Sequence, residues 1–113
     1  MMERVSLEVQ GAFRALADPS RRAMLRYLSE RDMTSGEVAG HFDMTRAAVK
    51  KHLSVLEEGH LISVHPKGRE RINRLEPMAL KSVVDWLTHF SKFWDEKLDK
   101  LQTAVEAAES EKK

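Results

Sequence analysis

Apolar residues recur at helical spacing through most of the first sixty positions. Residues 6–16 are predicted to form a first helix, because their apolar positions share one face. Asp18 followed by Pro19 has the form of an N-cap and a first helical position, so a second helix is expected from Pro19 to about Arg31.

Two shorter helices are predicted next. Thr34 and Glu37 have the spacing of a capping box, and the helix they open is expected to run to about Asp43. Thr45 then caps a helix in which Gly59 occupies the C′ position. Two short helices joined by a tight turn have the spacing of a helix-turn-helix unit.

The hydrophobic period changes after this unit. Residues 61–65 and 69–75 are predicted to be short strands, with residues 66–68 forming the turn between them. A β-hairpin that directly follows a helix-turn-helix defines its winged variant. The expected fold is therefore mainly α with a small β-hairpin.

The last segment carries a heptad pattern. Pro77 is predicted to open one helix over about residues 77–108, which would be about 48 Å long. So long a helix cannot be covered by its own small domain, which predicts a second copy of the chain. The residues expected to form this dimer interface are Leu7, Leu80, Val84, Leu87, Trp94, Leu98, Leu101 and Val105.

Length and composition fit one globular domain over residues 1–113, with a core over about residues 6–76. The absence of cysteine excludes disulfides and thiolate metal sites. No apolar run approaches the about 20 residues that span a membrane, and the first residues lack the apolar stretch of a signal peptide. A soluble, cytoplasmic protein is therefore expected.

The distribution of charge is more informative than the net charge of +1. Residues 46–74 carry seven Lys/Arg and three acids, a balance of +4, whereas residues 95–113 carry four lysines and six acids, a balance of −2. A basic middle and an acidic end predict an anionic partner for the middle of the chain.

Double-stranded DNA is the partner that the second helix of the helix-turn-helix unit predicts. The small Ala47 would allow close approach, and long basic side chains reach guanine edges or phosphates. We expect Arg46, Ala47 and Lys50 to face base edges and Lys51 to contact phosphate. The full predicted DNA-binding set on this helix is Thr45, Arg46, Ala47, Lys50, Lys51 and Ser54. The alternative is a solvated basic face, but the neighbouring basic hairpin favours DNA.

The hairpin tip and the second helix add further candidates. Lys67, Gly68 and Arg69 are predicted to follow the minor groove or the backbone, although a charged tip also keeps an edge hairpin soluble. Arg21 lies in the first turn of its helix, where a cation opposes the helix dipole. A phosphate contact and a plain surface charge both explain it.

No motif of an enzyme is present: the chain has no cysteine nucleophile, no Gly-x-Ser-x-Gly sequence and no phosphate-binding glycine loop. No cofactor is expected. Asp85 and His89 are spaced one helical turn apart and form a candidate metal pair, although a surface hydrogen bond explains such a pair more often.

Taken together, the motifs resemble the ArsR-type winged-helix repressors of prokaryotes. The resemblance lies in DPSRRAMLRYL, then MTSGEVAGHFDMTRAAVKKHLSVLEEGHLI, then KGRERINRL followed by a proline. It implies a homodimer joined through the first and last helices, an inverted-repeat operator and autoregulation. It also implies that residues 45–58 are the recognition helix and residues 66–69 the wing tip.

The chain departs from the metal-sensing branches of that family. It has no cysteine in the helix expected over 34–42, and Asp85 and His89 do not match the Asp-x-His and His-x-x-Glu spacing. Lys50 stands where many relatives carry serine.

The leading hypothesis is a homodimeric DNA-binding repressor with an unidentified inducer or protein partner. Two alternatives remain at this point. One is a protein-interaction module that uses Trp86, Phe90, Phe93 and Trp94, and the other is a metal-responsive regulator.

Overall fold

The computed structural model describes the backbone of residues 2–111 and the side chains of residues 9–111. The chain divides into two compact units, Met1–Val83 and Val84–Lys113. No helix in the described range is long and apolar enough to cross a membrane. In chain order the elements are α1 (Met2–Leu16), α2 (Pro19–Glu30), β1 (Met33–Thr34), α3 (Ser35–Ala39), α4 (Arg46–Glu58), β2 (Ile62–Lys67), β3 (Glu70–Leu75), α5 (Pro77–Thr88) and α6 (Ser91–Glu111).

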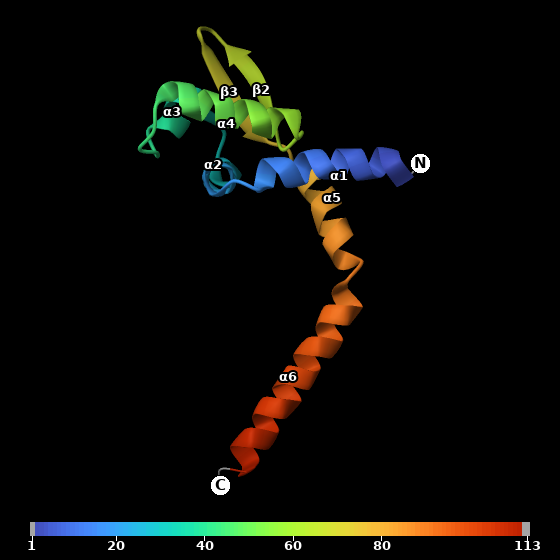
Figure 1. Ribbon diagram of the computed structural model, residues 1–113. Helices are drawn as coiled ribbons and strands as arrows, with labels where there is room; N and C mark the ends of the chain where they lie inside the picture. Colours follow the sequence, from blue (N-terminus) through green and yellow to red (C-terminus); the bar gives the residue numbers. More distant parts are fainter. Residues whose placement is uncertain (1, 112–113) are drawn as a thin grey trace. The chain divides into compact units, whose positions relative to one another are not determined.

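The first unit is a winged helix-turn-helix, as the sequence predicts (Figure 1). Its core draws apolar side chains from the first four helices, the sheet and the middle of α5. Met24, Leu56 and Leu61 are among the largest side chains with no exposed surface. The buried residues of this core are Ala12, Ala15, Met24, Leu25, Leu28, Met33, Val38, Val49, Leu53, Leu56, Leu61, Ile62 and Val83.

The start of α2 follows the sequence prediction. The Asp18 carboxylate accepts a hydrogen bond from the Arg21 backbone N–H at 3.1 Å, and Pro19 is the first helical residue. This hydrogen bond is the largest cause of the lowered pKa of Asp18, and nearby His52 and Arg21 lower it further. The helix ends with Arg31 as its C-cap, also as predicted.

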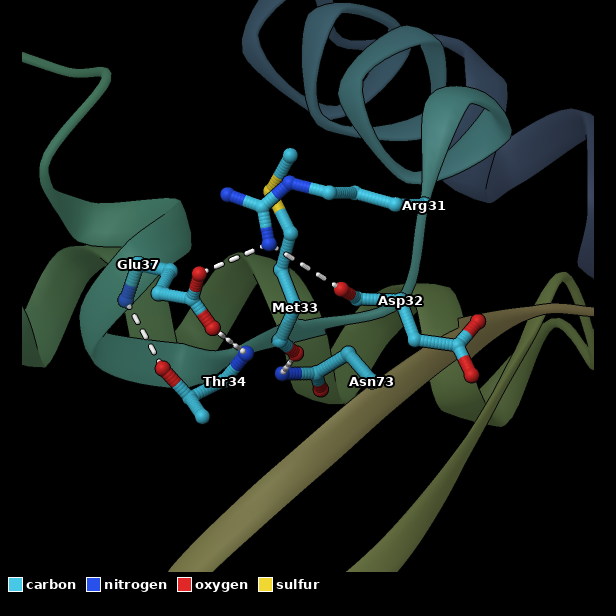
Figure 2. Close-up of polar contacts among 6 residues, drawn as sticks. All are labelled: Arg31, Asp32, Met33, Thr34, Glu37 and Asn73. Carbon is cyan, nitrogen blue, oxygen red and sulfur yellow. Dashed lines mark hydrogen bonds and ion pairs between the residues drawn. The ribbon is translucent and has the colours of Figure 1, made fainter.

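α3 is shorter than predicted. It ends at Ala39 rather than near Asp43, because His41 and Phe42 donate to carbonyls three residues back instead of continuing the α-helical pattern. The predicted capping box is present. Thr34 Oγ1 accepts from the Glu37 N–H and a Glu37 oxygen accepts from the Thr34 N–H, each at 3.0 Å (Figure 2).

A third strand, β1, was not predicted. The sheet order is β1-β3-β2, and Met33 of β1 lies opposite Asn73 of β3. Asn73 is buried, and its side-chain nitrogen donates to the Met33 carbonyl at 3.2 Å (Figure 2) and to Ser35 Oγ at 3.1 Å. These bonds join the wing to the start of the helix-turn-helix, and they satisfy a polar side chain that would be costly to bury alone.

The wing turn begins two residues later than predicted and ends one residue later. Pro66 and Lys67 belong to β2, and the turn consists of Gly68 and Arg69. Gly68 has φ +63°, a left-handed conformation that glycine adopts without strain.

The end of α4 also corrects a prediction. Gly59 is the C-cap with φ −81°, whereas His60 takes the left-handed conformation with φ 60°. Glycine is needed at position 59 for space, because a Cβ there would lie 2.7 Å from the Gly11 carbonyl oxygen and 3.0 Å from Ala15 Cβ. Gly11 and Gly59 thus mark the place where the backbones of α1 and α4 come close.

The single helix predicted over residues 77–108 is instead two helices. α5 ends at Thr88, and α6 begins at Ser91. Thr88 Oγ1 donates to the Val84 carbonyl at 2.7 Å, and the Phe90 N–H donates three residues back to Leu87 at 3.0 Å. Side-chain bonds of this kind weaken and bend an α-helix, and this stretch contains no proline or glycine. α6 has 21 residues and would be about 31 Å long.

Candidate nucleic-acid interface

α4 is fixed on the first unit by one apolar face. Val49, Leu53 and Leu56 are buried, and Thr45 caps the helix by accepting from the Ala48 N–H at 3.1 Å. The residues predicted to bind DNA lie away from this face, and all are exposed: Thr45, Arg46, Ala47, Lys50, Lys51 and Ser54. Their exposed placement is confirmed, and their contact with DNA remains a prediction.

A groove of about 530 Å³ separates α4 from the wing. Its helix side includes Arg46, Lys50 and Glu57, and its wing side includes Arg69 and Arg71. The remaining lining residues are Thr34, Ser35, Gly36, Ala39, Val49, Leu53, Ser54, Val64, Glu70 and Asn73. Four cations and two acids thus line one groove.

The four basic side chains of the groove differ from several arginines elsewhere in the first unit in their hydrogen bonds and ion pairs. Arg31 pairs with Glu37 at 2.7 Å, and Arg74 pairs with Asp32 at 3.0 Å. By contrast, across the described side chains, no hydrogen bond or ion pair occupies the charged ends of the groove cations, which are Arg46, Lys50, Arg69 and Arg71. Mutually repelling cations gathered at one groove favour an anion between them.

The field at the start of α4 adds to this preference. The first turn of the helix contains no acidic residue. The free backbone N–H groups of a helix N-terminus and its dipole both favour a negative group nearby. Thr45 and Arg46 therefore stand where a phosphate would be stabilised by the backbone as well as by charge.

The wing carries its predicted residues at the tip. Lys67 ends β2, and Gly68 and Arg69 form the turn. All three are exposed, and only Arg69 lines the groove.

Arg21 is largely bonded within the chain. Its Nε donates to the Ala15 carbonyl at 2.7 Å, Nη2 donates to the Arg14 carbonyl at 3.0 Å, and Nη1 lies 3.3 Å from His52 Nδ1. Arg21 therefore caps the C-terminal carbonyls of α1 and ties that helix end to α4. A phosphate contact by Arg21 stays a prediction, with two of its five N–H groups left for it.

The predicted dimer residues fall into three groups. Leu7 lies outside the described side chains, and Leu80 is partly buried against the core of the first unit. The others are between 50% and 61% exposed: Val84, Leu87, Trp94, Leu98, Leu101 and Val105. So many large apolar side chains in water at heptad spacing indicate a surface that a partner covers.

The candidate metal pair also remains untested. Asp85 and His89 lie one turn apart at the end of α5, where the His89 N–H bonds to the Asp85 carbonyl at 3.3 Å. Over the described residues, no group of three or more His, Cys, Asp or Glu side chains is placed to hold a metal ion.

Sequence reasoning missed the contribution of β3 to the groove. In the sequence Arg71 is only one residue of the basic segment 46–74, yet it shares the groove with Arg46 and Lys50. The alternation of the strand contains the signal, since Arg71 and Asn73 share a face. This signal is hard to recognise because Asn73, the buried residue of that face, is polar.

Comparison with known proteins agrees with this architecture. A family model described as a helix-turn-helix domain matches residues 16–65. Over 82 residues the chain is 33% identical to the transcriptional repressor SdpR of Bacillus subtilis, an alignment that covers 73% of this chain and 91% of that protein.

Solved structures extend the comparison. The crystal structure of the ArsR family transcriptional regulator RHA00566 superposes with a TM-score of 0.74 and 37% identity, covering 80% of this chain and 93% of that one. The winged helix-turn-helix domain of Mb0332 from Mycobacterium bovis, described as homodimeric, shares the fold with a TM-score of 0.65 and 18% identity, covering 78% of this chain and 84% of that one. The chain therefore belongs to the ArsR-type family of winged helix-turn-helix transcriptional regulators.

Proposed function

We propose that this protein is a homodimeric transcriptional repressor that binds an inverted-repeat DNA operator and regulates its own promoter. The observation that carries the proposal is the set of unpaired cations around the groove between α4 and the wing. A regulator rather than an enzyme is the function that such a surface supports, because it offers charge and shape to a polyanion.

In the proposed complex, α4 enters the major groove and the wing tip approaches the adjacent minor groove or backbone. Lys67 and Arg69 supply positive charge at that tip. Two copies related by a two-fold axis would place their recognition helices in successive major grooves, about 34–36 Å apart.

The dimer part of the proposal rests on the second unit. Val84, Leu87 and the α6 residues Trp94, Leu98 and Leu101 expose apolar surface at heptad spacing. A second copy would cover it, and the homodimeric description of Mb0332 is consistent with that arrangement in the same fold.

Fluorescence anisotropy tests the proposal on two labelled fragments of equal length. One is the DNA upstream of the protein's own gene, and the other is its scrambled sequence. We expect nanomolar binding with at least about 10³-fold preference for the upstream fragment. If each copy neutralises about four phosphates, the slope of log affinity against log salt is about −7.

Equal, weak binding to both fragments, lost with added salt, would reject a specific operator at this promoter. A slope near zero would reject the electrostatic interface itself.

The aromatic side chains of the second unit favour one other function, a protein-interaction module. Trp86, Phe90, Phe93 and Trp94 are between 38% and 56% exposed. In that case the protein would remain monomeric when pure and would show no preference for any DNA.

A further inference from the structure

The two adjacent lysines of the recognition helix point in different directions. Successive residues of an α-helix are rotated by about 100° about its axis. Lys50 lines the groove beside the wing, together with Arg46 and Glu57, whereas Lys51 does not line it. Lys51 instead lies with Ala47 on the side of α4 opposite the buried Leu56.

α4 therefore has two exposed faces with different chemistry. The first, here the wing-facing flank, consists of Arg46, Lys50 and Glu57. The second, here the crest, consists of Ala47, Lys51, Ser54 and Glu58, all exposed and centred about 180° from the buried face. Ser54 lies at the border, since it also reaches the groove.

The wing presents a matching positive side across the groove. Arg71 of β3 pairs with Pro66 of β2. Arg71 also shares one face of β3 with Asn73, which is buried. Because Asn73 is bonded to Met33 and Ser35, the strand that carries Arg71 is fixed to the start of the helix-turn-helix unit. The two sides of the groove are therefore held by one core.

We propose that this groove is a phosphate clamp: Arg71 and Lys50 hold one sugar-phosphate strand between them, and the crest residues Ala47, Lys51 and Ser54 read base edges. This inference rests on the proposed function and reverses the roles that the sequence suggested for the two lysines. A side chain on the crest reaches furthest from the protein and therefore meets base edges. A side chain on the flank meets the sugar-phosphate strand that separates the major groove of the DNA from its minor groove.

Of the two acids of the groove, Glu57 fits the same division. Glu57 and Glu70 line it without any hydrogen bond or ion pair of their side chains within the described part of the chain. Glu57 lies two turns of α4 after Lys50, so the basic part of the groove belongs to the N-terminal half of the helix. The helix side of the groove therefore has a positive and a negative end, which favours a phosphate at the positive end, whereas on the wing Glu70 lies between Arg69 and Arg71.

The clamp is tested with two matched pairs of full-length variants, Lys50→Ala with Lys51→Ala and Arg71→Gln with Arg74→Gln. Arg74 is a suitable control because it lies on the same strand and pairs with Asp32. Anisotropy is measured on the operator and on scrambled DNA across a salt series, and thermal unfolding confirms that each variant is folded.

We expect Lys50→Ala and Arg71→Gln to weaken binding to both DNAs by the same factor. Each should reduce the salt slope by about 0.9 per protein copy, the contribution of one phosphate. Lys51→Ala should lose at least about tenfold more affinity for the operator than for scrambled DNA. Arg74→Gln should leave both affinities unchanged.

Neutral methylphosphonate linkages, placed one at a time along the operator, show which phosphates of the DNA lie in the clamp. Wild-type protein should be weakened by neutral linkages at the outer edge of each half-site, and Arg71→Gln should lose that sensitivity.

The clamp is overturned if Arg71→Gln behaves like Arg74→Gln, or if Lys50→Ala impairs only operator binding. In those cases wild-type preference for the operator would still support the proposed function. If wild-type protein prefers no DNA, the proposed function and the clamp are both rejected.

Discussion

The two units of this protein use the same kind of side chain with opposite results. In the first unit, apolar residues at helical spacing are covered by the chain itself, so that Met24, Val38 and Leu56 have no exposed surface. In the second unit, α6 has no buried residue, and its Leu98 and Leu101 are 58% and 61% exposed. Hydrophobic periodicity predicts a face that will be covered, but it does not say which chain covers it.

Surface charge shows a second contrast, this time within the first unit. Arg21, Arg31 and Arg74 are bonded to groups of their own chain, whereas Arg46 and Arg71 are not. The first set is already occupied within the chain, and the second remains available for an anion. Counting basic residues along the sequence cannot separate these sets, because the difference depends on which carboxylates and carbonyls the fold brings near.

The largest effect is expected when charge is introduced on the exposed apolar face of α6. Leu98→Asp combined with Leu101→Asp should raise the dimer dissociation constant by at least about 100-fold, because two carboxylates would have to be buried against the partner. Sedimentation velocity measures this change. Thr103→Asp is the matched control, since position 103 lies outside the heptad seam on the same exposed helix. Equal effects of the two changes, or a wild-type protein that is monomeric, would contradict the proposed dimer.

The next largest effect is on the free energy of unfolding, where a buried methionine is compared with an exposed one. Met24→Ala should lower the free energy of unfolding by about 2–5 kcal/mol, because it leaves a cavity in the core. Met78 is 74% exposed, so Met78→Ala should change stability by less than about 0.5 kcal/mol. Urea unfolding measures both. A large effect at Met78 would show that a partner covers that position.

A smaller effect is expected where α1 and α4 come closest. Gly59→Ala should cost about 1–3 kcal/mol, because the new methyl group would lie 2.7 Å from the Gly11 carbonyl oxygen. Gly36→Ala is the control, since its nearest neighbour would be Thr34 Oγ1 at 3.8 Å, and alanine is the better helix former. Thermal unfolding should therefore move in opposite directions for the two variants, and a neutral Gly59→Ala would contradict the close approach.

The smallest effect concerns pH and the helix caps. The Thr34 N–H and the Arg31 guanidinium lower the pKa of Glu37 from its ordinary value of 4.5. A carboxylate whose pKa is lowered by folding contributes stability above that ordinary value and loses it as pH falls through the lowered folded pKa. The melting temperature of Glu37→Gln should thus approach that of the wild type as the pH falls below 4.5. A constant difference between the two proteins down to pH 2 would contradict this account.

Much of the fold follows from local sequence signals. The caps at Asp18, Thr34 and Thr45 each satisfy backbone N–H groups within three residues, so that short patterns were sufficient to place the starts of α2, α3 and α4. The order of elements and the wing follow in the same way.

The features that the sequence does not predict depend on contacts between residues that lie far apart in the chain. β1 exists because Met33 and Thr34 pair with Asn73 and Ile72, about 40 residues away. The sequence places Gly59 at a C′ position, because its contact with Gly11 cannot be seen in one helix. The break between α5 and α6 contains no proline or glycine, so the local sequence carries no strong signal of it.

The candidate site was predictable on α4 and only partly so on the wing. The exposed basic face of α4 follows from the positions of Val49, Leu53 and Leu56. The part played by Arg71 requires the three-dimensional pairing of β3 with β2 and the seating of Asn73.

Selection of bound sequences from a random DNA library tests the central claim most directly, because the result depends on both units. The first unit must recognise a half-site, and the second must hold two copies in a fixed relation. We predict enrichment of an inverted repeat whose half-sites are about 10–10.5 base pairs apart, centre to centre. Enrichment of a single half-site would contradict the dimer, and the absence of any enriched sequence would contradict a specific DNA-binding function.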